Sequence, residues 1–121
     1  MAKESVRQRK VADRVREAVS IVIDRKIKDP DKGFVTVTKV KMSRDLSIAS
    51  IYFTVLGDEK ALEKSLAALN RAKNFIRHEI AQDLNLRVVP DLRFFEDDTM
   101  SYSRKIDELL ESIKKDEPEQ D

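Results

Sequence analysis

The sequence predicts an α+β domain in which helices pack on one face of a three-stranded sheet. Apolar residues recur at helical spacing in four segments and alternate in three others. These segments follow one another in the order helix, strand, strand, helix, helix, strand, helix, which is typical of a two-layer domain. A chain of 121 residues is the usual size of one domain. We expect that domain over residues 1–114 and an acidic, disordered tail over residues 115–121.

The first element is an amphipathic helix over roughly residues 5–27. Its apolar side chains recur every three or four positions between Val11 and Ile27. Asp29-Pro30 ends this helix, because proline disfavours a helical residue before it and has no amide hydrogen. The helix is therefore predicted to turn one apolar side toward the sheet.

Two alternating segments, residues 34–42 and 46–55, follow as strands of an antiparallel hairpin. Both are rich in β-branched residues, and Ser43-Arg44-Asp45 connects them as a turn. We expect one face of the second strand to hold Ala49, Ile51, Phe53 and Val55.

Two helices joined by a kink are predicted next, with Asp58 as the N-cap of the first. The apolar face shifts between Leu69 and Phe75, which places the kink near Ala72-Lys73-Asn74. A third strand is expected over residues 86–95. It contains Pro90, so it must lie at an edge or a bulge.

The last predicted element is a helix after Asp97-Asp98-Thr99, which would cap it. Its apolar positions are Ile106, Leu109, Leu110 and Ile113.

The composition excludes several kinds of site. There is no cysteine, so disulfides and thiolate chemistry are excluded. Gly33 and Gly57 are the only glycines, whereas a phosphate-binding loop needs several within about ten residues. His78 is the only histidine, so a metal site would need carboxylates for its other ligands. We expect no metal, no cofactor and no small-molecule substrate.

The chain has neither a signal-peptide pattern nor a membrane-spanning segment. The first ten residues lack an apolar core, and no run approaches the roughly 20 apolar residues that span a bilayer. We therefore expect a soluble, cytoplasmic protein that does not bind membranes.

Charge is distributed unevenly along the chain, although the net charge is only +1. Residues 1–28 hold nine basic and four acidic residues, a net charge of +5. Residues 96–121 hold four basic and ten acidic residues, a net charge of −6. The basic first element favours a polyanionic partner, and two solvated faces of opposite sign are the alternative.

Four cations of the first helix fall in a narrow row: Lys3, Arg7, Lys10 and Arg14. At about 100° per residue they lie within roughly 60° of each other and about 130° from the centre of the apolar side, which suits backbone phosphates. A second basic group surrounds the predicted kink, and Arg87 follows it. Together these groups give the predicted RNA-binding residues Lys3, Arg7, Lys10, Arg14, Arg71, Lys73 and Arg77.

The aromatic residues do not predict a stacking platform for bases. Most of the five phenylalanines sit in apolar patterns that suit a core. Recognition is therefore expected to rest on phosphates and on RNA shape. The phenylalanines are Phe34, Phe53, Phe75, Phe94 and Phe95.

The element order resembles the type II KH domain, but no glycine between residues 58 and 114 could build its Gly-x-x-Gly loop. This interrupted form is similar to the ribosome-binding factor A family along nearly the whole chain. Five stretches carry the resemblance: the basic first helix with residues 28–30, and residues 35–40, 43–46, 72–77 and 86–95.

The resemblance implies a non-enzymatic, cytoplasmic factor that binds the immature 30S subunit and assists late processing of 16S rRNA, with importance in the cold. Its implied partners are 16S rRNA and the free 30S subunit, and we expect a monomer. The family's kink reads Ala-x-Gly. Asn74 stands at that glycine after Ala72, where asparagine tolerates a left-handed conformation. Asp31 stands where the family often has arginine, which argues against RNA contact at that corner.

Two alternatives stay open. One is a protein-interaction module that docks a partner on an exposed strand edge or on the last helix, without direct RNA binding. The other is an enzyme, which would need a pocket around His78, Glu96, Asp97 and Asp98.

Overall fold

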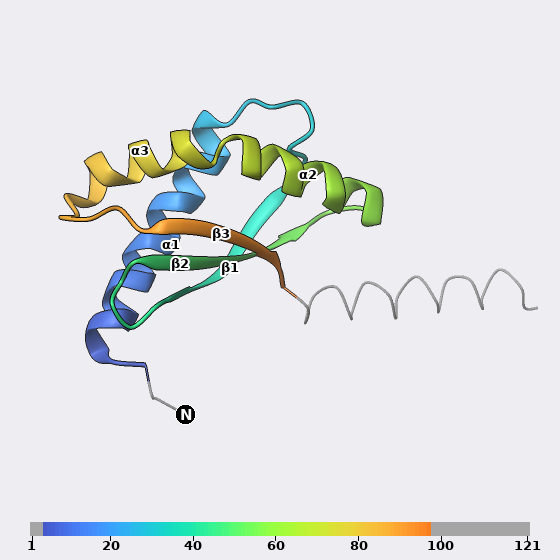
Figure 1. The fold of residues 1–121 in the computed structure, drawn as a ribbon. Coiled ribbons are helices and arrows are strands. Elements are labelled where there is room, and N and C mark those ends of the chain that lie inside the picture. Colours follow the sequence, from blue (N-terminus) through green and yellow to red (C-terminus); the bar gives the residue numbers. More distant parts are fainter. Residues whose placement is uncertain (1–3, 98–121) are drawn as a thin grey trace, which may run out of the picture.

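The computed structural model describes residues 4–97, in which three helices lie on one side of a three-stranded sheet (Figure 1). The α+β class and the order of elements as far as the third strand are confirmed. The predicted last helix and the tail 115–121 lie outside the described residues. The elements are α1 (Val6–Lys26), β1 (Val35–Met42), β2 (Ile48–Val55), α2 (Glu59–Arg71), α3 (Lys73–Leu84) and β3 (Asp91–Glu96).

The sheet is mixed, with strand order β1-β2-β3. Strands β1 and β2 pair antiparallel as the predicted hairpin, and Met42 faces Ala49 next to the turn. Strands β2 and β3 pair in parallel, with Tyr52 opposite Phe95. A parallel pair needs a crossover connection, which α2 and α3 supply.

Burial alternates along each strand, so the two faces of the sheet differ. On β2 the expected inward set is confirmed, because Ala49, Ile51, Phe53 and Val55 are at most 3% exposed. The apolar side of α1 packs on this face together with α2, and α3 packs against α1. The outward residues of all three strands are half-buried or exposed within residues 4–97.

The helix α1 agrees with its predicted range to within one residue at each end. Its start is fixed by a capping box, in which the Gln8 N–H donates to Ser5 Oγ at 3.0 Å and the Ser5 N–H donates to Gln8 Oε1 at 2.8 Å. At its other end, Lys32 Nζ donates to the carbonyl oxygen of Ile23 at 2.8 Å. None of the helices in residues 4–97 is long and apolar enough to span a bilayer.

Two strand boundaries differ from the prediction. Leu46 has a φ of +62° and belongs to the turn, so β2 begins at Ile48. Pro90 is buried and comes before β3, so the strand starts one residue after it, where every amide can donate. The expected edge position of β3 is confirmed. The bulge of this sheet lies instead in β1, between Val37 and Lys39.

The predicted kink exists, but its conformation differs from the expectation. Ala72 joins α2 to α3 with φ −88° and ψ −1°, and its N–H donates to the Ala68 carbonyl at 3.0 Å. Asn74 lies in the right-handed helix α3 and is not among the positive-φ residues of the described chain. A left-handed Asn74 is therefore wrong: the bend occurs at Ala72, in a region open to ordinary residues.

The expectation that most phenylalanines form the core is also wrong. Phe53 and Phe94 are buried, but Phe34 is 76% exposed, and Phe75 and Phe95 are each 43% exposed. Strand alternation explains the miss for the adjacent pair Phe94-Phe95, because consecutive strand residues point to opposite faces.

Candidate nucleic-acid interface

The basic row of α1 lies on the exposed side of the helix. Arg7, Lys10 and Arg14 are all exposed, one turn apart, whereas Lys3 lies outside the described residues. The Arg14 guanidinium Nη2 donates to the Leu84 carbonyl oxygen at 3.3 Å and so contacts the last turn of α3. Arg7 and Lys10 have no polar partner within residues 4–97, which leaves both available to phosphates.

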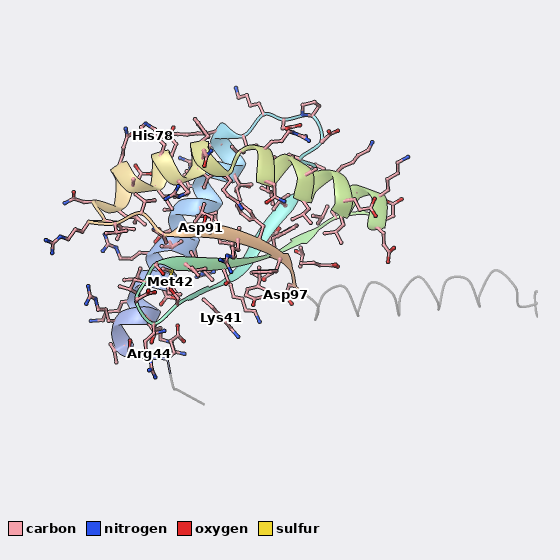
Figure 2. All side chains as sticks on the ribbon, in the orientation of Figure 1. Lys41, Met42, Arg44, His78, Asp91 and Asp97 are labelled. Atoms are coloured by element: carbon pink, nitrogen blue, oxygen red, sulfur yellow. The ribbon has the colours of Figure 1, made fainter. Side chains whose placement is uncertain are left out.

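The turn between β1 and β2 lies beside the start of α1 and adds a cation that the sequence did not single out. Gln8 Nε2 donates to the Met42 carbonyl at 3.1 Å. Arg7 and Arg44 line one small hollow of about 110 Å³, so Arg44 extends the basic row. Figure 2 shows Arg44 at the end of the molecule where α1 begins. No periodicity argument could find Arg44, because only the tertiary fold brings the turn to α1.

One carboxylate accepts several hydrogen bonds within the same turn. Asp45 Oδ1 accepts hydrogen bonds from Ser47 Oγ at 2.7 Å, Ser43 Oγ at 2.8 Å and the Ser47 N–H at 3.1 Å. These donors, with the Ser47 hydroxyl first, lower the pKa of Asp45 to about 2. These bonds join Asp45 to Ser43 and Ser47, the residues on either side of Arg44 and of the left-handed Leu46.

The C-terminal end of α3 reaches the same region. Asn85 ends the helix in a left-handed conformation, with φ +49°, and the exposed Arg87 follows. The Asp91 N–H donates to the Ser47 carbonyl at 2.8 Å, which ties this segment to the turn after β1. We call this end of the molecule the basic end; its cations are Arg7, Lys10, Arg14, Arg44 and Arg87.

The cations near the kink are far from the basic end. Lys26 pairs with Glu79 at 3.2 Å and Arg71 pairs with Asp29, so α3 begins near the end of α1. Arg14 and Lys26 are 12 residues apart, which is about 18 Å along a helix. The two predicted basic groups therefore do not merge into one surface.

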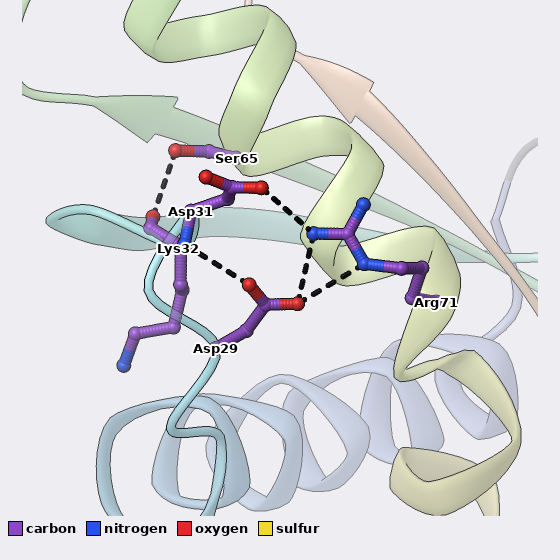
Figure 3. Close-up of polar contacts among 5 residues, drawn as sticks. All are labelled: Asp29, Asp31, Lys32, Ser65 and Arg71. Atoms are coloured by element: carbon purple, nitrogen blue, oxygen red, sulfur yellow. Dashed lines mark hydrogen bonds and ion pairs between the residues drawn. The ribbon is translucent and has the colours of Figure 1, made fainter.

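Arg71 is held at the kink by two carboxylates (Figure 3). Its Nη2 donates to Asp29 Oδ2 at 2.9 Å and to Asp31 Oδ2 at 3.2 Å, and its Nε donates to Asp29 Oδ2 at 3.1 Å. The Asp31 N–H also donates to Asp29 Oδ1; this bond and the Arg71 guanidinium lower the pKa of Asp29. The two carboxylates neutralise the Arg71 guanidinium, which makes Arg71 a poor partner for a phosphate.

The segment that follows Asp31 is anchored by Ser65 of α2. The fully buried Ser65 hydroxyl donates to the Lys32 carbonyl at 2.7 Å (Figure 3). Gly33 has a φ of +59°, and a Cβ atom there would stand 3.2 Å from Ser65 Oγ. The corner is thus packed around Arg71 and Ser65.

The other two kink cations differ from each other. Arg77 is half-buried and donates from Nε to the Pro90 carbonyl at 3.0 Å and from Nη2 to the Val89 carbonyl at 3.2 Å. Lys73 is half-buried at the first position of α3, without a polar partner in the described part of the chain. Arg77 therefore has a structural role, whereas the charge of Lys73 is not engaged by a polar group in residues 4–97.

The residues of the enzyme alternative are separated. His78 lies on the exposed side of α3, whereas Asp97 follows β3 at the far end of the sheet (Figure 2). Asp97 is buried and its Oδ2 accepts a hydrogen bond from Thr38 Oγ1 at 2.6 Å. Within residues 4–97 no group of three or more histidine, aspartate and glutamate side chains could hold a metal ion. Asp98 lies outside the described residues.

Comparison with known proteins gives a consistent family. The sequence model described as Ribosome-binding factor A matches residues 7–110. A protein named Ribosome-binding factor A from Macrococcus caseolyticus is 44% identical over 112 residues, which cover 93% of this chain and 98% of that protein. One of the same name from Carboxydothermus hydrogenoformans is 46% identical over 111 residues, 92% of this chain and 89% of that protein.

Comparison with solved structures leads to the same family. The crystal structure of ribosome-binding factor A from Thermus thermophilus has a TM-score of 0.66 at 27% identity, over 74% of this chain and 94% of that one. The solution structure of a Thermotoga maritima protein, described as a putative ribosome binding factor A, gives 0.68 at 31% identity, over 80% and 92%. A homology model of the Thermus thermophilus factor, fitted into the cryo-EM map of a 30S–RbfA complex, gives 0.60 at 28% identity, over 69% and 88%. The chain belongs to the ribosome-binding factor A family.

Proposed function

We propose that this protein binds the immature 30S ribosomal subunit and assists the late maturation of its 16S rRNA, acting by binding and not by catalysis. It acts as a monomer in the cytoplasm, on free 30S subunits, and it matters most in the cold. The family match over residues 7–110 carries the proposal. A relative of the same fold has been fitted into the map of a 30S complex.

The basic end is the part of this surface best suited to rRNA phosphates. Arg7 and Lys10 are exposed without a polar partner in residues 4–97, and Arg44 shares a hollow with Arg7. Each phosphate contact by such a cation releases counterions, so affinity should fall steeply as salt rises. We assign the main phosphate contacts to Arg7, Lys10 and Arg44 and a lesser one to Arg14. Lys73 would contact phosphate separately, at the kink, and Lys3 is assigned from the sequence alone. Arg71 and Arg77 act chiefly by holding the fold.

The test is co-sedimentation with purified 30S subunits, 50S subunits and 70S ribosomes over a salt series. We expect selective binding to 30S subunits, weakened at least tenfold by the double charge reversal Arg7→Glu/Lys10→Glu. Lys60→Glu/Lys64→Glu is the matched control. It makes the same change of charge on two exposed lysines of α2 and should leave binding unchanged.

The maturation step needs a cellular readout. In cells lacking the factor, the wild-type chain should restore growth in the cold and reduce unprocessed 16S precursor, and Arg7→Glu/Lys10→Glu should do neither. Equal binding to all ribosomal particles would overturn the proposal. Binding that persists at high salt and is unchanged in Arg7→Glu/Lys10→Glu would favour the protein-interaction module instead.

A further inference from the structure

The outward face of the sheet has a composition unlike that of an ordinary solvated surface. The helices of residues 4–97 lie on the opposite side (Figure 1). On this outward face two aromatic rings stand at the centre, and hydroxyl and cationic side chains surround them. The outward residues include Thr36, Lys39, Lys41, Ser50, Tyr52, Thr54, Arg93 and Phe95.

The two rings lie side by side because of the strand register. Tyr52 of β2 and Phe95 of β3 are direct partners in the parallel ladder. Their ring centroids are 5.5 Å apart, with planes inclined by 32°. Phe95 is 43% exposed, so a large apolar surface faces solvent at this point. The pair forms a small aromatic platform on an otherwise polar face.

Cations border the platform on both sides. Lys39 Nζ stands over the Tyr52 ring, 4.7 Å from its centroid, and Lys41 Nζ is 6.0 Å away. Figure 2 shows Lys41 on the side of the sheet opposite α3. On β3, Arg93 lies two residues before Phe95 on the same face, and its Nε is 3.6 Å from Asp91 Oδ2. Three cations against two carboxylates, Asp91 and Asp97, leave a net positive charge around the rings among the described residues.

This arrangement selects one class of partner. An apolar protein surface would have to strip water from three cations without neutralising them, at a large free-energy cost. A single-stranded nucleic acid offers what the face lacks: flat bases for the rings and phosphates for the cations. Lys39 covers one face of the Tyr52 ring, and a base that stacked there would displace the ammonium toward a phosphate.

We propose that the outward sheet face binds unpaired RNA, with Tyr52 and Phe95 stacking on bases and Lys39, Lys41 and Arg93 contacting the flanking phosphates. The platform is a second site, distinct in position and chemistry from the basic end. It deepens the proposed function and rests on it only for the source of the RNA, a single-stranded segment of rRNA. Aromatic stacking distinguishes single strands from duplexes, because paired bases are not available to rings.

The fluorescence of Tyr52 can report binding at this site. The chain has no tryptophan and two tyrosines, Tyr52 and Tyr102. In the full chain carrying Tyr102→Phe, tyrosine emission comes from Tyr52 alone. A short oligouridylate should quench that emission in a saturable way at low salt, and an RNA duplex of the same length should quench it at least tenfold less efficiently.

Variants of Phe95 test aromatic stacking while the charge of the face stays unchanged. Phe95→Ala should lower oligouridylate affinity about tenfold, which corresponds to the loss of one aromatic stacking partner. Phe95→Leu keeps most of the apolar volume and should lose affinity to a similar extent, so the loss does not depend on a cavity or on misfolding in Phe95→Ala. Phe75→Ala is the matched control, because Phe75 has the same 43% exposure but lies on α3, across the sheet from the platform. It should bind like the parent.

Three outcomes would overturn this inference: no quenching by oligouridylate, equal quenching by the duplex, or unchanged affinity in both Phe95 variants. The result is separable from the proposed function. If the platform is absent, 30S subunits should still sediment with the protein and still respond to Arg7→Glu/Lys10→Glu. If the 30S proposal fails, Tyr52 quenching by a free single strand is unaffected.

Discussion

Arg71 and Asp29 form a two-bond ion pair, with Nη2 and Nε of the guanidinium 2.9 Å and 3.1 Å from the same carboxylate oxygen. Asp31 adds a third contact at 3.2 Å. The pair joins the end of α2 to the segment that follows α1. A cation predicted to bind RNA is thus occupied by the protein itself.

Arg71→Gln should therefore affect folding more than binding. We expect a small decrease in Tm, because the pair is exposed and an exposed pair contributes little. Affinity for 30S subunits should change less than in Lys10→Gln. Thermal unfolding followed by circular dichroism, with co-sedimentation at one salt concentration, measures both. A loss of binding larger than that of Lys10→Gln would mean that Arg71 contacts the 30S subunit.

Removing a cation from the basic end should change the salt dependence of 30S binding. Lys10→Gln and Arg44→Gln should each reduce the slope of log K against log salt by about one, because each removes one phosphate contact. Lys64→Gln on α2 is the control and should leave the slope unchanged. If Arg44→Gln behaves like Lys64→Gln, the turn between β1 and β2 does not touch RNA.

Arg77→Leu should destabilise the protein. The guanidinium is half-buried and donates to the carbonyls of Val89 and Pro90, which would both lose a partner. We expect the free energy of unfolding to fall by about 1–3 kcal/mol, measured by urea denaturation. An exposed arginine of α1 changed in the same way, Arg16→Leu, should have a smaller effect. Equal effects would mean that the two carbonyl bonds contribute nothing.

Gly33→Ala should also lower stability. The φ of +59° disfavours any residue with a side chain, and the new Cβ would stand 3.2 Å from Ser65 Oγ. Together these should reduce the free energy of unfolding by about 1–2 kcal/mol. Asn85→Gly tests the reverse case, because Asn85 already has a φ of +49°. Glycine there should leave the urea midpoint unchanged or slightly higher.

Acid should loosen the turn between β1 and β2. The pKa of Asp45 is about 2 in the folded chain, below its ordinary value of 3.8. A carboxyl with a lowered pKa contributes stability above its ordinary pKa and loses it as pH falls through the folded value. The Tm difference between wild type and Asp45→Asn should therefore be largest above about pH 4 and shrink toward pH 2. A difference that stays constant over this range would contradict the assigned role of the carboxylate.

Local patterns predicted most of the fold. The buried side of α1, the inward set on β2 and the Asp58 cap, which accepts from the Ala61 N–H at 2.9 Å, all follow from spacing within a few residues. The kink near Ala72 was also predictable, from the shift of the apolar face. Its conformation was not, because analogy placed a left-handed residue at Asn74 and the bend occurs two residues earlier.

The candidate site was harder to predict, because it depends on which ends of the elements meet. Spacing predicted the row of Arg7, Lys10 and Arg14 but could not place Arg44 beside it. Nor could spacing show that Arg71 has carboxylate partners 40 and 42 residues away in sequence. The aromatic platform was missed for a related reason: Phe94 and Phe95 are equally apolar, and only the strand register decides which one faces outward.

The parallel pairing of β2 with β3 has a consequence for how this protein is made. The β1–β2 hairpin needs only a short loop and can close once residue 55 has left the ribosome. Strand β3 must wait for residues 56–90, and closing a longer loop is slower and entropically less favourable. Phe95 joins Tyr52 only at that last step. A nascent chain still short of residue 96 therefore has no completed sheet, and the ribosome that synthesises this protein cannot meet its finished outward face until almost the whole domain has been translated.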